Sequence, residues 1–241
     1  TVRPVRPALC ALKCSEDFFP SLAGVRTNAG IKLMLSDTVM AEDAGELQLT
    51  DYGISGIPVF QISRYATDDE TGKLRRGLTA ELDFMPYIDR EGLSSFITDS
   101  INANPSYNMR MILSGILNKK LADLIADRAG FSSDISCADS GMDGAVRLAS
   151  LIKCFTVHIK GTADISRAQV CAGGCDTDCI DPESMSSRIV KGLYITGELL
   201  DIDGICGGYN LQWAWATGYL AGISAGRMSK VHKFTQEYVD D

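Results

Sequence analysis

The residues best placed for cofactor chemistry lie between Leu193 and Gly226. The apolar run Leu193 to Thr196 has the composition of a β-strand, the Gly- and Asp-rich segment Gly197 to Gly208 predicts a loop, and Asn210 is the expected cap of a helix that runs to about Gly226. Glycines let a backbone approach a ligand closely, and a helix N-terminus offers unpaired N–H donors with a partial positive charge. Strand, loop and helix together predict a site for a polar cofactor.

Cysteine is the competing chemical signal. Cys171, Cys175 and Cys179 lie four residues apart, and on a helix they would present three thiols on one face, as a zinc or iron–sulfur site requires. Gly173 and Gly174 disfavour a helix there, and no fourth ligand has a matching spacing. Reduced thiols used as small apolar residues are therefore the simpler interpretation, and no metal site is predicted. A redox disulfide between two of the three is a further alternative.

Composition argues against several other classes of function. The chain has 23 basic and 31 acidic residues, and the net charge of −8 disfavours a nucleic-acid or anionic-membrane partner. The apolar part of the last helix is about 16 residues long, whereas a membrane span needs about 20. His158 lies in a strand-like run and His232 in a polar tail, so both are interpreted as structural. With no signal peptide recognised, a cytoplasmic location is expected.

In the rest of the chain, the hydrophobic pattern changes from the period of strands to that of helices and then returns to that of a strand. The predicted strands are Ala8–Leu12, Ile31–Ser36, Gly45–Thr50, Ile57–Ser63 and Leu78–Phe84, with a hairpin tip at Thr67–Lys73. The predicted helices are Gly92–Asn102, Arg110–Ala129 and Asp143–Lys153, after which Phe155–Ile159 resumes strand composition. Short strands at this spacing predict a small antiparallel barrel or sandwich, and the helices form an insertion within it.

Small residues recur every four positions in the last helix, at Ala214, Gly218, Gly222 and Gly226. They form a smooth stripe along one face, which indicates a closely packed partner. The simplest interpretation is that this is a core helix packed against a sheet. If that partner is missing, the stripe leaves apolar surface exposed and promotes self-association.

Several segments resemble one known family. They are Gly192–Trp215, which begins Gly-Leu-Tyr-Ile-Thr-Gly-Glu-Leu-Leu-Asp-Ile-Asp-Gly, Ala168–Cys175, Gly45–Thr50 and Gly53–Gly56. Taken in chain order, they resemble the BaiN-type, aminoacetone-oxidase-like family of NAD(P)/FAD-dependent oxidoreductases. The resemblance covers most of the chain, which makes it far more specific than a single glycine loop.

The resemblance implies an α+β fold. A small antiparallel β-barrel with an inserted helical subdomain at about 88–153 would occupy residues 1–163, and residues 164–241 would form the C-terminal strand–loop–helix part of a Rossmann-like FAD-binding domain. The family begins with a Gly-x-Gly-x-x-Gly fingerprint that holds the cofactor pyrophosphate, and this sequence contains none. The chain is therefore expected to be a C-terminal portion that lacks the N-terminal lobe and is inactive alone.

The resemblance also implies a function, which is flavin N5 hydride chemistry on a small organic substrate, with FAD as cofactor and NAD(P)H as co-substrate. The isoalloxazine would lie against the Asp201–Asn210 loop, and Glu198 would contact the ribityl chain, although Glu198 alone could equally be a solvated carboxylate. The cofactor-binding candidates are Gly197, Glu198, Asp201, Gly204, Gly207, Gly208, Tyr209 and Asn210. No catalytic acid or base is identified. The alternatives are a non-catalytic binding module and a thiol or metal module.

Overall fold

The computed structural model describes residues 1–131, 136 and 143–237, and the chain forms two compact units. The barrel unit contains Ala11–Ala66 and Leu74–Ala163, and the C-terminal unit contains Thr1–Cys10, Thr67–Lys73 and Asp164–Asp241. The family resemblance implied that all of residues 1–163 form one domain. Thr1–Cys10 belongs instead to the C-terminal unit, because its strand pairs with a strand that follows residue 163.

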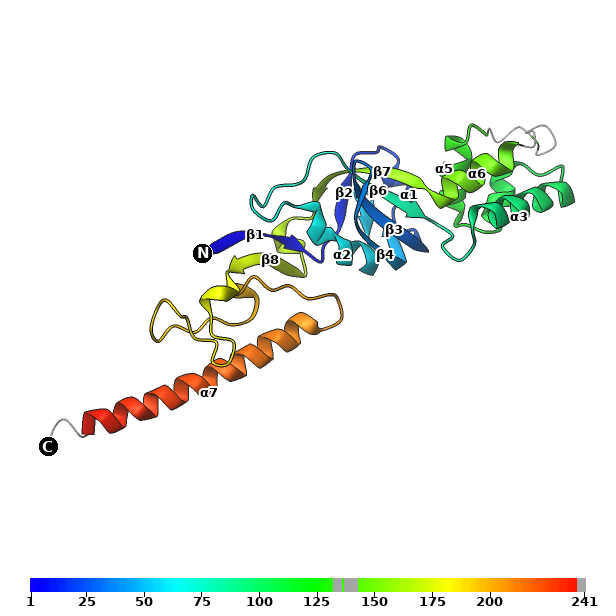
Figure 1. Ribbon diagram of the computed structural model, residues 1–241. Helices are drawn as coiled ribbons and strands as arrows, with labels where there is room; N and C mark the ends of the chain where they lie inside the picture. The colour runs from blue at the N-terminus through cyan, green and yellow to red at the C-terminus, as the bar shows by residue number, and fades with distance from the viewer. Residues whose placement is uncertain (132–135, 137–142, 238–241) are drawn as a thin grey trace. The chain divides into compact units, whose positions relative to one another are not determined.

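The barrel unit is built on a closed, six-stranded antiparallel barrel (Figure 1). Around the barrel the strands are β2 (Leu12–Cys14), β5 (Gly53–Ser55), β4 (Thr38–Leu49), β3 (Arg26–Leu35), β6 (Leu78–Asp83) and β7 (Phe155–Thr162). Closure leaves no unpaired strand edge. The expected α+β class with a small antiparallel barrel is thereby confirmed.

Every second side chain of the strands points into the barrel, and these side chains fill it. In β7, Phe155, Val157 and Ile159 are buried while the residues between them are exposed, and β6 alternates in the same way. Ile31 and Leu33 of β3 are buried opposite them. A period of two places every second residue on the same face of a strand, which is why this sequence pattern predicted β6 and β7 well.

Two predicted strands near these are wrong. Ile57–Ser63 is helix α2, followed by the 3-10 turn η1 (Arg64–Ala66), because Pro58 suits the first turn of a helix and cannot donate to a sheet. The segment Ala8–Leu12 is divided between β1 (Val2–Ala8) and β2, since Leu9 adopts a φ of +47° that interrupts an extended chain. A short helix, α1 (Phe19–Leu22), follows β2.

The helical insertion connects β6 to β7. It contains α3 (Arg90–Ala103), α4 (Met109–Ser114), α5 (Lys119–Arg128) and α6 (Asp143–Lys153). The single helix predicted over Arg110–Ala129 is wrong, because α4 ends at Ser114 with Gly115 as its C-cap, and the Asn118 side chain caps a new helix by accepting the backbone N–H of Lys120. Cys137 lies outside the described residues.

Lys153 fastens the insertion to the barrel. Its Nζ lies 2.6 Å from Asp83 Oδ2 and donates to the carbonyl oxygens of Met85 and Ile88. Asp83 ends β6 and Met85 and Ile88 follow it, while Lys153 ends α6. The ammonium therefore joins the two ends of the insertion where it leaves and re-enters the barrel.

The C-terminal unit holds a two-stranded antiparallel sheet of β1 and β8 (Val170–Cys175). It also contains the 3-10 turns η3 (Ile165–Arg167), η4 (Thr177–Cys179) and η5 (Gly197–Leu199), and the helix α7 (Tyr209–Glu237). Thr67–Lys73 forms a turn closed by the Asp68 N–H and the Lys73 carbonyl oxygen, but η1 precedes it, so it is not the tip of a strand hairpin.

Two further predictions are wrong, one for the segment before the last helix and one for the start of that helix. Leu193–Thr196 is not a strand, because within the described chain it forms only an isolated bridge between Tyr194 and Ser186. Asn210 lies inside α7 rather than at its cap, since the Gly208 carbonyl oxygen accepts the Gln212 N–H, and the helix continues past Gly226. Of the helices in the described ranges, none combines the length and apolar character that a membrane crossing needs.

The barrel core predicts a large effect for one substitution. Leu33→Ala removes a fully buried side chain from β3 and should lower the free energy of unfolding by about 2–5 kcal/mol. The measurement is urea denaturation followed by circular dichroism. Val39→Ala on β4 is the control, because Val39 is exposed, and a similar loss in both variants would contradict the proposed core.

Candidate functional site

The candidate site begins where η5 packs on α7. The backbone N–H of Gly197 donates to Thr217 Oγ1 at 3.0 Å, and the Trp213 indole N–H donates to the Gly197 carbonyl oxygen at 3.1 Å. Gly197 has a φ of +61° and a Cβ there would lie 3.4 Å from Ala214. Its conformation and its close approach to the helix both favour glycine.

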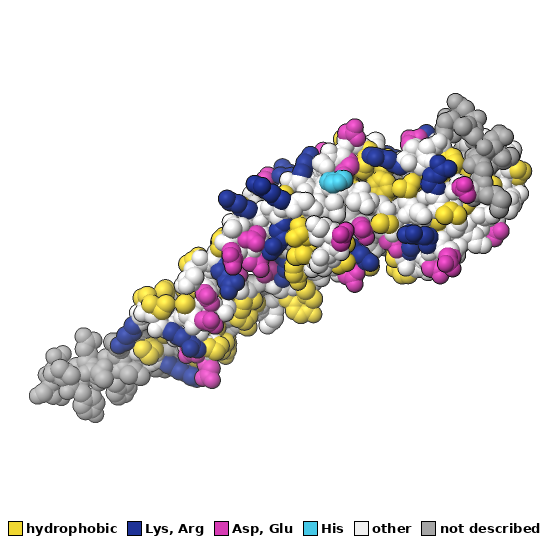
Figure 2. Space-filling model, turned by 45° about the horizontal axis from the view of Figure 1, so that its top comes forward, with side chains coloured by type: hydrophobic (Ala, Val, Ile, Leu, Met, Phe, Trp, Pro, Cys, Tyr) yellow, Lys and Arg dark blue, Asp and Glu magenta, His cyan; other side chains and the backbone are white. Residues whose placement is uncertain are grey.

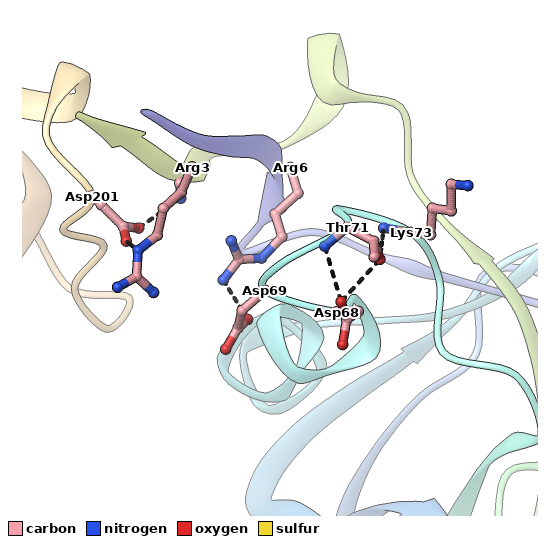
Figure 3. A network of polar contacts seen from close by, with 8 residues as sticks. Arg3, Arg6, Asp68, Asp69, Thr71, Lys73 and Asp201 are labelled. Carbon is pink, nitrogen blue, oxygen red and sulfur yellow. Dashed lines mark hydrogen bonds and ion pairs between the residues drawn. The ribbon is translucent and has the colours of Figure 1, made fainter. Parts of the chain in front are cut away.

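From η5 the chain runs along the edge of β8. Glu198 Oε1 accepts the backbone N–H of Cys171, and Asp201 Oδ1 accepts that of Gly173 at 3.0 Å. Asp201 Oδ2 lies 3.1 Å from Arg3 Nε (Figure 3). Both oxygens of Asp201 are therefore engaged by the protein, whereas Glu198 is exposed and uses one oxygen.

A second ion pair lies nearby on β1. Arg6 is nearly buried, and its Nη2 lies 2.6 Å from Asp69 Oδ1 (Figure 3). Asp69 belongs to the 67–73 turn, in which Asp68 Oδ1 accepts both the N–H and the hydroxyl of Thr71. This pair attaches the turn to β1.

The predicted glycine loop is held by the side chain of Asn210. Asn210 Oδ1 accepts the Gly204 N–H at 2.7 Å, and Nδ2 donates to the Gly204 carbonyl oxygen at 3.1 Å. The side-chain amide thus pairs with both backbone polar groups of one residue, Gly204, as a neighbouring strand would. Asn210 positions the loop through its side chain, and its backbone N–H stays available to a ligand.

The loop ends at the N-terminus of α7. Gly207 and Gly208 have φ angles of +126° and +90°, and a Cβ on Gly208 would meet nothing within 4 Å. Among the described residues, no acceptor contacts the backbone N–H groups of Tyr209, Asn210 or Leu211. An open glycine backbone beside unpaired N–H donors is an arrangement that can bind an anionic or carbonyl oxygen.

An open groove of about 770 Å³ lies within the same unit, between β1, β8 and the segment 193–199. Its lining is largely apolar and includes Val2, Val5, Cys171, Cys175 and Leu193. Burial raises the pKa of the Cys171 thiol, and the neighbouring Glu198 carboxylate raises that pKa further. Cys171 therefore stays protonated near neutral pH and is a poor nucleophile.

Three members of the small-residue stripe of α7, Gly218, Gly222 and Gly226, are exposed, while Ala214 is half-buried beside Gly197. A Cβ on Gly218, Gly222 or Gly226 would meet nothing within 4 Å, so the close packing partner expected from the sequence is not found in the described chain. Trp215 and Tyr219 flank the stripe and are 69% and 70% exposed. Figure 2 shows hydrophobic side chains at the surface of this unit among charged ones.

The comparisons with known proteins agree with this architecture. The family described as HI0933-like protein barrel and H2TH domain matches residues 6–170, more than half of the chain. The chain belongs to this family. The match spans the barrel, the helical insertion and the return into β8, which are the elements described above.

Relatives of this HI0933-like chain include one reductase. The chain is 42% identical over 226 residues to the 3-dehydro-bile acid delta(4,6)-reductase of Clostridium scindens, covering 93% of this chain and 54% of the reductase. It is 32% identical to the ribosomal RNA dihydrouridine synthase of Haemophilus influenzae and 31% identical to that of Escherichia coli, covering 83% and 82% of this chain and 47% and 46% of those proteins. The chain thus spans about half the length of the curated relatives it matches. The resemblance to BaiN-type oxidoreductases is confirmed.

The cysteines of the HI0933-like chain are the residues that an alternative thiol or metal chemistry would use. Seven cysteines fall in the described residues, and no disulfide bond joins any two of these seven. Cys171 and Cys175 lie on β8 and Cys179 ends η4. No group of three or more His, Cys, Asp or Glu side chains within the described ranges is placed to hold a metal ion.

Two site residues were missed by sequence reasoning. Thr217 is a buried hydroxyl that also donates to the Trp213 carbonyl oxygen at 2.7 Å, and Arg3 pairs with Asp201. A threonine among the apolar residues of a helix is a signal that could have been read as a buried hydrogen-bonding group. The Arg3 pairing had no local signal, because its partner lies 198 positions later in the sequence.

The Asn210 contact predicts a measurable loop effect. Asn210→Ala removes both hydrogen bonds to Gly204 and should cost about 1–3 kcal/mol locally, so the Gly204 amide should exchange its hydrogen at least about tenfold faster. Amide exchange followed by NMR measures this. Asn210→Asp keeps the acceptor for the Gly204 N–H and should give a smaller increase, and equal exchange in all three proteins would contradict the contact.

The exposed face of α7 predicts self-association. Light scattering of the purified chain should show an apparent mass that rises with concentration, and Trp215→Glu should reduce that rise by adding charge to the apolar face. Tyr87→Glu is a matched control, because Tyr87 is an exposed aromatic residue of the barrel unit. A wild-type chain that stays monomeric at high concentration would contradict the prediction.

Proposed function

We propose that this chain supplies the flavin-contacting part of the FAD site of an oxidoreductase that acts on a small organic compound. The observation that carries the proposal is the open backbone of Gly207 and Gly208 leading into the unpaired N–H groups of α7. Such donors stabilise negative charge on a carbonyl edge, which the flavin ring presents when it is reduced.

The residues present fit this cofactor. A side chain at Gly208 would project into open space beside the helix N-terminus, so the glycine leaves room for a planar ring to approach the backbone. The backbone N–H groups of Tyr209, Asn210 and Leu211 would hold the carbonyl edge. Glu198 is exposed and has one oxygen that binds no described group, which could accept hydrogen bonds from the ribityl hydroxyls.

The remaining candidates act indirectly in this proposal. Asp201 and the Asn210 side chain hold β8 and the loop in place, and Gly197 sets the distance between η5 and α7. Gly204 is the residue whose backbone the Asn210 side chain binds. When bound, FAD supplies hydride transfer at its N5 atom, and the chain's own groups orient the ring and exclude water.

The substrate side of the proposal rests on the relatives. The 42% identical relative is a bile-acid reductase, which supports a reductase of a small organic compound with NAD(P)H as the source of electrons. The relatives of about 31–32% identity act on ribosomal RNA. The net charge of −8 favours the small substrate, since RNA binding needs a basic surface.

The proposal includes a division of the cofactor between two parts. The described sheet, loop and helix offer contacts for the flavin end of FAD, and the sequence contains no Gly-x-Gly-x-x-Gly fingerprint for the pyrophosphate. We therefore propose that residues outside this sequence hold the adenosine end. The exposed apolar face of α7 and the groove beside β8 are surfaces on which such residues could pack.

Titration with FAD tests the proposal directly. The chain should quench flavin fluorescence in a saturable way, and Glu198→Ala should weaken binding. Gly208→Ala should weaken it more, because the methyl group lies where the ring must approach. The matched control is Gly192→Ala, since Gly192 has a similar φ of +80° and open surroundings but lies outside the loop. No saturable binding, or equal weakening by both glycine variants, would contradict the proposal.

A further inference from the structure

A second open pocket, of about 570 Å³, lies entirely within the barrel unit. It is bounded by the segment after β2, the end of α5, the end of α6 and the outer face of β7. It is independent of the flavin proposal, because none of its residues belongs to the loop or helix described above.

Arg128 provides a positive charge in this pocket. Its guanidinium carbon lies 5.0 Å from the centroid of the Phe18 ring, and no carboxylate of the described residues forms an ion pair with it. Stacking on an aromatic ring orients a guanidinium while its N–H edges stay available. Arg128 differs in this from Arg110, which is paired with Asp123 and Asp127.

His158 provides a second polar group with a fixed orientation. Its Nδ1 lies 2.8 Å from Glu16 Oε1, which also accepts the backbone N–H of His158 at 2.7 Å. The Glu16 side chain is only 12% exposed, whereas the imidazole is 69% exposed. Because Nδ1 is held by the carboxylate, Nε2 is the nitrogen left for a ligand.

The walls of the pocket determine what kind of ligand fits. Phe18, Leu151 and Phe155 contribute apolar surface, and Ser15 and Thr156 contribute hydroxyl groups. A stacked arginine with no carboxylate partner is suited to a carboxylate or phosphate, since the planar guanidinium donates two parallel hydrogen bonds to such groups. Apolar walls favour a ligand with an apolar body attached to that acid group.

We propose that this pocket binds a small organic acid, with Arg128 holding its carboxylate or phosphate and His158 providing a second polar contact. The chain has two histidines, so the imidazole NMR spectrum contains few signals, and His158→Gln assigns the one in the pocket. The probes are benzoate, phenyl phosphate and benzyl alcohol, which share an aromatic body and differ in the group it carries.

The expected result is a saturable shift of the His158 signals with benzoate, with phenyl phosphate or with both, and none with benzyl alcohol. The preferred acid identifies the ligand class. Arg128→Gln should weaken binding at least about tenfold, because a charge-assisted contact is lost. Arg26→Gln is the control, since Arg26 lies on β3 in an exposed pair with Glu46 outside the pocket, and its affinity should be unchanged.

Three results would overturn the proposal. They are no saturable shift with either acid, an equal response to benzyl alcohol, and unchanged affinity in Arg128→Gln. Circular dichroism of each variant checks folding, and Arg128 is exposed, so its substitution should leave the spectrum unchanged. A variant that loses affinity while keeping the wild-type spectrum supports a direct contact.

Discussion

The contact between Gly197 and α7 is the interaction on which the C-terminal unit depends. Two hydrogen bonds, one donated to Thr217 and one accepted from Trp213, hold the backbone of Gly197 against the helix. The Thr217 hydroxyl in turn donates to the Trp213 carbonyl oxygen. The chain then passes along β8, where Glu198 and Asp201 bind backbone N–H groups. One close approach, which glycine permits, therefore sets the start of the glycine loop relative to both the helix and the sheet.

The polar groups of this region have two different roles, since some bind the chain's own backbone and others stay available to a ligand. Asp201 and Asn210 bind the chain's own backbone, so they hold the loop rather than extend toward solvent. What remains for a ligand is backbone N–H groups and one oxygen of Glu198. Recognition by a rigid backbone suits a planar cofactor with a carbonyl edge, because the donors need no reorganisation when charge develops.

The barrel unit is organised differently, around its closed sheet. Its closed sheet supplies a stable platform, and Lys153 joins both ends of the helical insertion to it. The insertion brings the end of α5 to the segment after β2, which places Arg128 over Phe18 beside His158. Charged and aromatic groups distant in the sequence thus meet on the outside of a barrel whose interior is filled by apolar side chains.

Local pattern in the sequence determined much of the barrel unit. Alternation predicted a strand over Leu78–Phe84, observed as Leu78–Asp83, and a period of 3.6 predicted the helix Asp143–Lys153, because each pattern produces one buried face wherever it is packed. The glycine loop and the helix after it were also evident from local composition. Pro58 was a local signal for the helix at Ile57–Ser63, whereas tertiary structure alone decided that Leu193–Thr196 has no strand partner in the described chain. It alone paired β1 with β8, gave Asp201 and Asn210 their partners, and assembled the Arg128 pocket. These features depend on which distant segments meet, and short-range propensity carries no information about that.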